Sequence, residues 1–268
     1  METQNDTEFE DGHWRAIETS GQIESEELWE SIYALRKLGT ARVLSTALSW
    51  CQDSAPFRRS VGVSILAQFG KDTKAYPQES QAMILAMIAN EQDPEVITSL
   101  ISAVHFRELP DAAAWLISLA EHPLEDVRWR VAWALPIPNL SDLAMVRSSL
   151  ETLLKLMEDS EPEVREWATL SISITQEDSP AIREALLARL SDSDFGTRSE
   201  AAVGLADRKE PRAIELLGQH LRSDRVGELF VEAAELYADS SLRPALLGLK
   251  KWWDVNPELL DRAIAACS

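Results

Sequence analysis

The chain has 268 residues and a formal net charge of -19, because 45 acidic residues outnumber 26 lysines and arginines. A surface that binds nucleic acid must neutralise phosphates, so this charge, with no cluster of basic residues, argues against a nucleic-acid partner. Hydrophobic residues make up 45% of the chain, which is enough to bury a core, and this length favours either two domains or an architecture that grows by repetition.

The N-terminal segment is strongly acidic, since the first 30 residues contain ten Asp and Glu against Arg15 alone. We expect residues 1–10 to form an acidic mobile tail and residues 11–268 to form one domain. The opening METQNDTEFEDG lacks the pattern of a secretory signal, and no stretch approaches the roughly 18 apolar residues of a membrane span, so a cytoplasmic protein without membrane contact is expected. Cys51 and Cys267 are too few for a disulfide framework and are interpreted as packing residues.

A turn motif recurs along the chain, as DSAPFRR (53–59), DPEVI (93–97), EDVR (125–128), DSEPEVR (159–165) and DSDFGTR (192–198). Residues 198–202 (RSEAA) also match residues 230–234 (FVEAA), which adds a further copy. The equivalent positions are spaced 31 to 38 residues apart and are Arg59, Ile97, Arg128, Arg165, Arg198 and Phe230. Such self-similarity at a nearly fixed period is typical of repeat architectures.

Each motif predicts a helix end, a tight turn and a new helix, because Asp-Ser and Asp-Pro steps favour turns and Pro favours the first helical position. Apolar residues then recur at helical spacing, as at Val127, Val131, Ala134 and Leu135. Long alternating runs of β-branched residues are absent, so strands are not expected. The predicted helix pairs cover residues 9–39, 40–70, 71–108, 109–139, 140–175, 176–209, 210–239 and 240–268.

Units of this length with an Asp-x-x-x-x-Val-Arg turn resemble HEAT repeats of the bacterial, lyase-like type. The resemblance covers nearly the whole chain and implies an all-α, right-handed α-solenoid of about seven to eight helix pairs. It also implies that each turn Arg bonds to the acidic turn residue of a neighbouring unit, a contact that is in doubt where Ile97 and Phe230 replace the Arg. The second helix of each pair would line the concave side.

Helical geometry then selects candidate contact residues on the second helices. At about 100° per residue, Trp129 and Trp133 point away from the core position Val127, with Arg130 at their edge. Exposed Trp beside Arg is typical of interaction hot spots, although packing against a neighbouring helix or a second copy is the alternative. The candidate partner-binding residues are Trp129, Arg130, Trp133, Glu166, Trp167, Leu170, Ser199, Glu200, Val203, Val231, Glu232 and Glu235.

The C-terminal part of this list is acidic, and Asp207 and Asp239 lie beside it. A charged run is usually only a solvated face, but carboxylates collected on one surface favour a basic partner. Trp50, Trp115, Trp252 and Trp253 are interpreted instead as core or cap residues.

Motifs for catalysis or cofactor binding are missing, including phosphate loops, Cys-x-x-Cys and His-Glu-x-x-His, so no enzyme, metal or cofactor is predicted. His105 would lie near the concave side, but it is interpreted as a histidine at the boundary between core and surface without a functional role. HEAT-like DNA glycosylases use concave tryptophans with a carboxylate, yet they have basic grooves. Phycobilin lyases share the repeat type, which does not transfer function.

Several segments are similar to HEAT-repeat immunity proteins encoded beside Rhs polymorphic toxins. They are FRRSVG (57–62), ILAQ (65–68), VREWA (164–168), VGLADRK (203–209), EAAEL (232–236) and LRPAL (242–246). This resemblance spans about residues 40–268 and implies a protein that sequesters a toxin domain, with contact residues not transferable from the family. Three hypotheses follow: an immunity protein, a general assembly adaptor, and a divergent glycosylase-like DNA binder. The oligomeric state is not predicted.

Overall fold

The protein was analysed as a computed structural model, which describes residues 4–20, 25–70 and 76–268. Within these ranges the chain forms sixteen α-helices and three short 3-10 helices, with no strand. The all-α prediction is therefore confirmed. The helices group into two compact units, Met1–Val146 and Arg147–Ser268, called unit 1 and unit 2 below.

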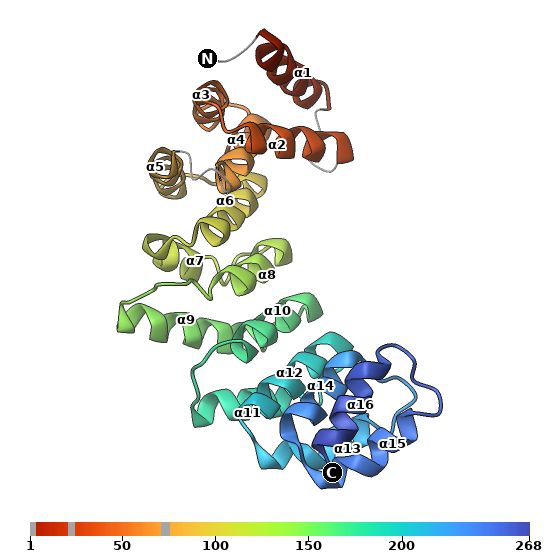
Figure 1. The fold of residues 1–268 in the computed structure, drawn as a ribbon. Coiled ribbons are helices and arrows are strands. Elements are labelled where there is room, and N and C mark those ends of the chain that lie inside the picture. The colour runs from red at the N-terminus through yellow and green to blue at the C-terminus, as the bar shows by residue number, and fades with distance from the viewer. Residues whose placement is uncertain (1–3, 21–24, 71–75) are drawn as a thin grey trace. The chain divides into compact units, whose positions relative to one another are not determined.

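Unit 1 contains helices arranged as successive antiparallel pairs (Figure 1). The helices are α1 (Gln4–Ser20), α2 (Glu26–Leu38), α3 (Ala41–Trp50), α4 (Pro56–Gln68), α5 (Pro77–Ile88), α6 (Pro94–Arg107), η1 (Pro110–Ala112), α7 (Ala113–Ser118) and α8 (Glu125–Ala134). Helix α9 (Leu143–Leu156) contains the boundary between the two units.

Unit 2 continues the same alternation of first and second helices. Its further helices are α10 (Pro162–Ser173), α11 (Pro180–Arg189), α12 (Phe195–Asp207), η2 (Pro211–Ala213), α13 (Ile214–His220), α14 (Glu228–Tyr237), η3 (Ser240–Leu242), α15 (Arg243–Leu249) and α16 (Pro257–Ala266). Seven of the eight predicted residue ranges contain one helix pair each, and in the first range, 9–39, the pair begins earlier, because α1 starts at Gln4. The predicted repeat organisation is thus confirmed for the described residues.

The turns between paired helices owe their shape to the aspartates of the repeated motif. A side-chain oxygen of each aspartate accepts the backbone N–H two residues later, from Ala55 to Asp53 at 2.8 Å, and likewise at 2.9 Å to Asp159 and to Asp192. This closes a local turn that competes with continued helix. Proline then occupies the start of the second helix, as at Pro162, where the missing N–H costs no hydrogen bond.

The core of each unit lies between the helices of each pair and between successive second helices. In unit 1, α4 packs on α6 and α6 on α8, and in unit 2, α10, α12, α14 and α16 pack in sequence. The residues predicted to face the core are buried, including Val127, Val131, Ala134 and Leu135, each at most 1% exposed. No single pair could bury its apolar face alone, so stacking produces the core.

Two of the turn arginines, Arg59 and Arg165, link neighbouring repeats as the HEAT resemblance implied, whereas Arg198 donates to the carbonyls of Asp192 and Ser193 in its own turn. Arg59 makes a bidentate ion pair with Glu91, with Nε···Oε2 at 2.8 Å and a second bond at 2.9 Å. Arg165 pairs in the same way with Asp192, at 2.9 and 2.8 Å, and its remaining nitrogen donates to the carbonyls of Asp159 and Ser160. In both pairs the acidic partner belongs to the following repeat.

Apolar side chains replace this link where the motif lacks arginine. Ile97 is 5% exposed and Phe230 is 1% exposed. The Phe230 ring stacks on His220, with centroids 4.9 Å apart, and meets the edge of Phe195 at 5.7 Å. Packing therefore joins the helices at these two repeats.

The N-terminal segment differs from the predicted mobile tail. Residues 1–3 lie outside the described residues, but Gln4–Glu10 form the first part of α1. Glu10 is 1% exposed, accepts a hydrogen bond from Thr40 at 2.6 Å and pairs with Arg42 at 3.3 Å. The local excess of acids concealed these long-range partners. Cys51 and Cys267 are both buried and unpaired with each other, in agreement with their interpretation as packing residues.

Candidate functional site

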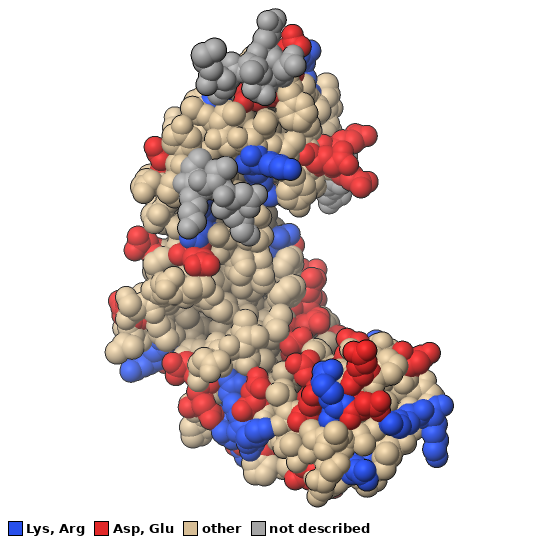
Figure 2. Space-filling model, in the orientation of Figure 1, with Lys and Arg blue, Asp and Glu red and all other residues tan. Residues whose placement is uncertain are grey.

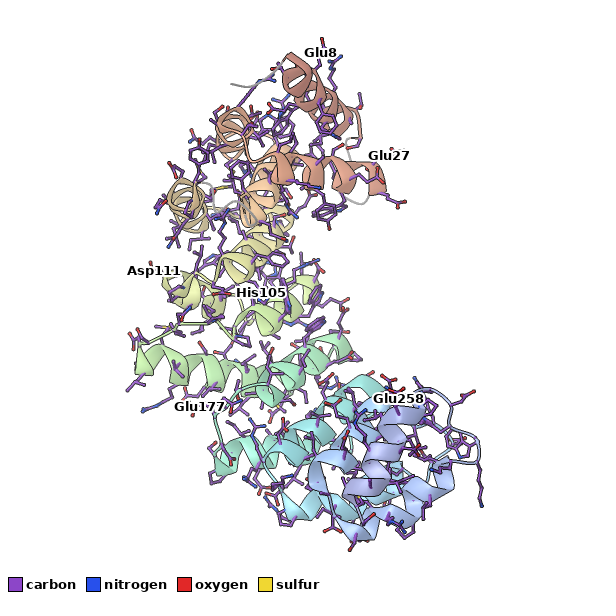
Figure 3. All side chains as sticks on the ribbon, in the orientation of Figure 1. Glu8, Glu27, His105, Asp111, Glu177 and Glu258 are labelled. Atoms are coloured by element: carbon purple, nitrogen blue, oxygen red, sulfur yellow. The ribbon has the colours of Figure 1, made fainter. Side chains whose placement is uncertain are left out.

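An aromatic cluster occupies the ends of two second helices in unit 1. Trp133 on α8 stacks on His105 of α6 (labelled in Figure 3), with ring centroids 3.8 Å apart and an interplanar angle of 29°. Phe106 meets Trp133 edge-on at 5.7 Å and is 42% exposed. Burial lowers the pKa of His105, and the nearby charge of Glu108 only partly opposes this. The cluster is therefore a neutral, half-buried aromatic surface at pH 7.

Trp129 and Arg130 lie one helical turn before Trp133 and are positioned by the same carboxylate. The Trp129 indole N–H donates to Oδ1 of Asp126 at 3.0 Å, and Nε of Arg130 lies 3.4 Å from Oδ2. The Arg130 guanidinium carbon lies 4.3 Å from the Trp129 ring centroid, which is cation–π geometry. Both side chains are half-buried, so the sequence-based prediction of partial exposure agrees with the structure for Trp129, Arg130 and Trp133.

A groove of about 770 Å³ lies along the second helices of unit 2. Acidic side chains gather over the helices of unit 2 with basic ones among them (Figure 2). The groove combines acidic walls with an apolar lining, and its residues include Glu166, Phe195, Ser199, Glu200, Leu229, Glu232, Glu235, Leu236, Leu259 and Arg262. Four of the predicted acidic contact residues, on α10, α12 and α14, are thus brought into one groove.

The carboxylate of Glu166 lies against the first turn of α12, where Gly196 has no side chain to displace it. A Cβ atom at this glycine would clash with the carboxylate of Glu166. The glycine therefore allows the carboxylate to lie against α12. Burial, followed by the charges of Asp194 and Glu163, raises the pKa of Glu166.

Glu200 is the groove carboxyl group whose pKa is affected by acidic residues on both neighbouring second helices. Burial, followed by the charges of Glu166 and Glu232, raises its pKa to about 7. A carboxyl group usually titrates near pH 4, so this one changes charge within the physiological range.

Arg262 on α16 supplies a basic side chain to the groove and pairs with Glu235 of α14. Its Nε lies 2.8 Å from Oε1, and a terminal nitrogen lies 3.2 Å from Oε2. The pair is accessible to solvent, because the Arg262 side chain is 59% exposed and the Glu235 side chain is 28% exposed. One end of the groove is therefore already neutralised.

Not every predicted contact residue is placed where a partner could touch it. Val231 is fully buried, because α14 packs between α12 and α16, so its placement at the concave face is wrong. Ser199 lines the groove but is 3% exposed, and its hydroxyl donates to the carbonyl of Phe195 at 2.9 Å. Trp167, Leu170 and Val203 are half-buried on unit 2 and do not line the groove.

The other tryptophans separate into buried and exposed members. Trp50 and Trp253 are buried, and the Trp253 indole donates to the carbonyl of Val226 at 2.7 Å. Trp115 is half-buried. Trp252 is 50% exposed, so its interpretation as a core or cap residue is wrong. Consecutive residues in this turn point to opposite sides, and only one of them reaches the core.

Some groove and cluster residues were missed by the sequence analysis. Phe106, Phe195 and Arg262 lie beside predicted residues but come from neighbouring helical positions or from the last helix pair. Phe195 lies within the turn motif DSDFGTR (192–198), which is the one sequence signal that points to it.

No group of three or more His, Cys, Asp or Glu in the described ranges is placed to hold a metal ion. Among the same residues, no helix has both the length and the apolar character needed to cross a membrane.

Comparison with known proteins identifies the repeat type. A family model of HEAT repeats matches residues 81–173 and 150–238, which together make up more than half of the chain. Protein YibA of Escherichia coli K12 is 26% identical over 246 residues, which cover 86% of this chain and 85% of YibA. A crystal structure of E. coli YibA has a TM-score of 0.74 at 23% identity, covering 100% of this chain and 97% of that one. An engineered protein has a TM-score of 0.58 at 17% identity, with coverages of 95% and 78%.

Proposed function

Because the chain belongs to the HEAT-repeat family, we propose that it binds another protein and carries out no chemistry of its own. The observation that carries this proposal is the half-buried aromatic cluster of His105, Phe106 and Trp133, with Trp129 and Arg130 beside it. Large aromatic side chains that packing already holds in place lose little entropy when a partner covers them. Trp, Tyr and Arg are also the residue types enriched at the energetic centres of interfaces.

The acidic groove of unit 2 supports a basic partner. Glu166, Glu200 and Glu232 place carboxylates on three successive helices, and the whole chain has a net charge of -19. Such a field attracts a cationic protein and repels nucleic acid. A glycosylase-like DNA-binding function is disfavoured for the same reason.

In its most specific form, the proposal is a cytoplasmic immunity protein that sequesters the toxic domain of a cognate effector. This part is supported by the resemblance of several segments, such as VREWA (164–168), to HEAT-repeat immunity proteins encoded beside Rhs toxins. An immunity protein needs no cofactor, since it acts by covering its target. A general assembly adaptor would use the same two surfaces, so the identity of the partner separates the two functions.

The test is co-expression of the tagged chain with the product of the adjacent gene, followed by co-purification and a growth assay. An immunity protein should form a complex and should rescue cells from the toxicity of that product. A complex without toxicity or rescue would favour the adaptor. Absence of binding to the adjacent gene product would refute the immunity function.

Binding should also depend on the aromatic cluster, which the double variant Trp129→Ala/Trp133→Ala removes. A matched control is Trp252→Ala, because Trp252 is exposed but lies outside both surfaces. If the control weakens binding as much as the double variant does, the aromatic cluster is not the docking surface.

A further inference from the structure

The groove of unit 2 has two kinds of wall. Leu229, Leu236 and Leu259 contribute apolar surface, together with the Phe195 ring, whereas Glu166, Glu200 and Glu232 contribute carboxylates. A volume of about 770 Å³ is enough for several side chains of another protein. The groove therefore fits an amphipathic occupant better than a purely apolar or purely charged one.

The charges of this groove are unevenly compensated. Glu235 is paired with Arg262 through two hydrogen bonds. Within the ranges that the structure describes, neither a lysine nor an arginine makes an ion pair with Glu166, Glu200 or Glu232, although Arg262 interacts with Glu232 through its charge. The charged groups that act on Glu200 are acidic. A positively charged group from a partner would therefore be complementary to these three carboxylates, which the fold places together.

We propose that this groove is a docking site for a basic amphipathic segment of a protein partner, with one arginine side chain lying among Glu166, Glu200 and Glu232. Apolar residues flanking that arginine pack on Phe195 and the groove leucines. This inference rests on the proposed protein-binding function and specifies the chemistry of the bound segment. A guanidinium suits the position because its planar set of donors can reach carboxylates on more than one helix.

Arg262 shows how an arginine fits at this surface. Its side chain crosses from α16 to α14 and binds both carboxylate oxygens of Glu235 while remaining largely exposed. The partner's arginine would repeat this arrangement deeper in the groove, one turn earlier on α14. Arg262 itself is anchored on the last helix and remains paired with Glu235.

Docking of a cation should release a proton from the groove. Glu200 faces Glu166 from α10 and Glu232 from α14, and burial, followed by the charges of these two carboxylates, raises the pKa of Glu200 to about 7. Glu163 and Asp194 act in turn on Glu166, and Glu232 also acts on Arg262. An arginine placed among them favours the charged carboxylate and lowers that pKa. Binding should consequently tighten as the pH rises from about 6 to about 8.

The experiment uses isothermal titration calorimetry of the full chain with two peptide probes. One is the acetylated and amidated peptide Leu-Arg-Leu-Leu-Arg-Leu, and its twin carries citrulline in place of both arginines. The arginine peptide should bind at least about tenfold more tightly than its twin, because citrulline keeps the shape and removes the charge. Its affinity should rise between pH 6 and pH 8, and buffers of different ionisation enthalpy should report proton release.

At pH 8, where most Glu200 side chains are ionised, the matched variants have nearly the same change in net charge. Glu200→Gln/Glu232→Gln should weaken the arginine peptide about tenfold and abolish the pH dependence. Glu151→Gln/Glu215→Gln changes two exposed residues on the first helices of unit 2 and should alter the affinity less than about twofold. Equal binding of the two peptides, no binding at about 1 mM, or equal loss in both variants would overturn the proposal.

The same variants separate this inference from the proposed function. If the adjacent gene product binds the parent and the Glu200→Gln/Glu232→Gln variant equally well, the groove assignment is wrong and the protein-binding function stands. If the peptides discriminate as expected while that product fails to bind, the groove assignment stands and the immunity function is refuted.

Discussion

The second helices of the two units share one packing scheme and present different chemistry to the outside. In unit 1, α6 and α8 end in the stacked rings of His105 and Trp133, with Phe106 exposed beside them. In unit 2, α10, α12 and α14 carry Glu166, Glu200 and Glu232 into an acidic groove. The inward-facing residues of both sets are mainly buried Val, Ala, Leu and Ile, with Phe230 and several Ser and Thr among them in unit 2.

This difference shows which positions the repeat constrains. A helix pair must bury its apolar stripe against its neighbours, so inward positions vary little in character. Outward positions are not needed for stacking and can be aromatic in one place and acidic in another. The turn links follow the same rule, because Arg59–Glu91 and Arg165–Asp192 repeat across the units while the surfaces diverge.

The largest expected effect concerns these repeated links. Asp192→Ala should lower the free energy of unfolding by about 3 kcal/mol, because it leaves Arg165, which is 10% exposed, without its carboxylate. Glu91→Ala in unit 1 should lower the free energy of unfolding less, by about 2 kcal/mol. Arg59 is 19% exposed, so water can solvate its guanidinium when the carboxylate is removed. Urea denaturation of both variants measures the difference. An equal loss would show that the two units use the link to the same extent.

A second prediction tests whether the aromatic cluster of unit 1 serves binding more than folding. Trp133→Ala should weaken partner binding by about 2 kcal/mol, as expected for a hot-spot residue. It should also lower the free energy of unfolding by about 1 kcal/mol, since the stacking on His105 and the edge contact with Phe106 are lost. Surface plasmon resonance and thermal melts measure the two effects. A stability loss that exceeds the binding loss would identify Trp133 as a core residue.

The acidic groove of unit 2 should reveal itself in the pH dependence of stability. Folding raises the pKa of Glu200 to about 7, so the folded state binds this proton more tightly than the unfolded chain, whose glutamate titrates near pH 4.5. The contribution of Glu200 to stability should therefore decrease as the pH rises from about 4.5 to about 7. Glu200→Gln should be more stable than the parent at pH 8 by about 1–2 kcal/mol, allowing for screening by water in the groove.

Denaturant titrations of parent and variant at pH 5 and pH 8 isolate this effect, because other carboxyl groups contribute equally to both proteins. Glu215→Gln, an exposed change on α13, provides the control and should leave the difference between the two pH values unchanged. A parent and Glu200→Gln variant with parallel pH profiles would contradict the electrostatic role of Glu200.

The smallest expected effect is kinetic. Glu232→Lys/Glu235→Lys should slow association with a basic partner a few-fold and flatten its salt dependence, since both changes replace a negative charge of the groove by a positive one and weaken the field that attracts the partner. Reversal at Glu151 and Glu215 is a suitable control, whereas Glu10 is not, because it is buried against Thr40 and Arg42. Stopped-flow association at several ionic strengths tests this. If the control slows association as much as the groove variant, only the overall charge steers the partner.

Much of the fold follows from local patterns. The Asp-rich turns, the prolines at helix starts and the apolar spacing predicted all eight helix pairs, and only the first pair begins outside its expected range, at Gln4. Local signals suffice here because each repeat contacts mainly its sequence neighbours. The acidic N-terminal segment was misinterpreted where its partners, Thr40 and Arg42, lie about 30 residues away.

The candidate site was only partly predictable. A helical wheel identifies the side of a helix that faces away from one neighbour, and it correctly placed Trp133, Glu200 and Glu232 at a partly exposed surface. It could not show that Val231 is enclosed between two further helices, or that Trp252 and Trp253 separate into exposed and buried positions. Those outcomes depend on the packing of each helix against the helices on both of its sides, and a helical wheel considers only one of them.

The amino-acid sequence by itself determined the repeat, the helix pairs, the inward-facing residues and the acidic character of the chain, because periodicity and charge are local properties. Tertiary structure alone decided the stacking of His105 on Trp133, the fit of Glu166 against Gly196 and the pairing of Arg262 with Glu235. It also decided the pKa of Glu200, since burial and two like charges from other helices meet only in the folded groove. These features depend on distances between residues about 30 positions apart, which packing sets and no local pattern encodes.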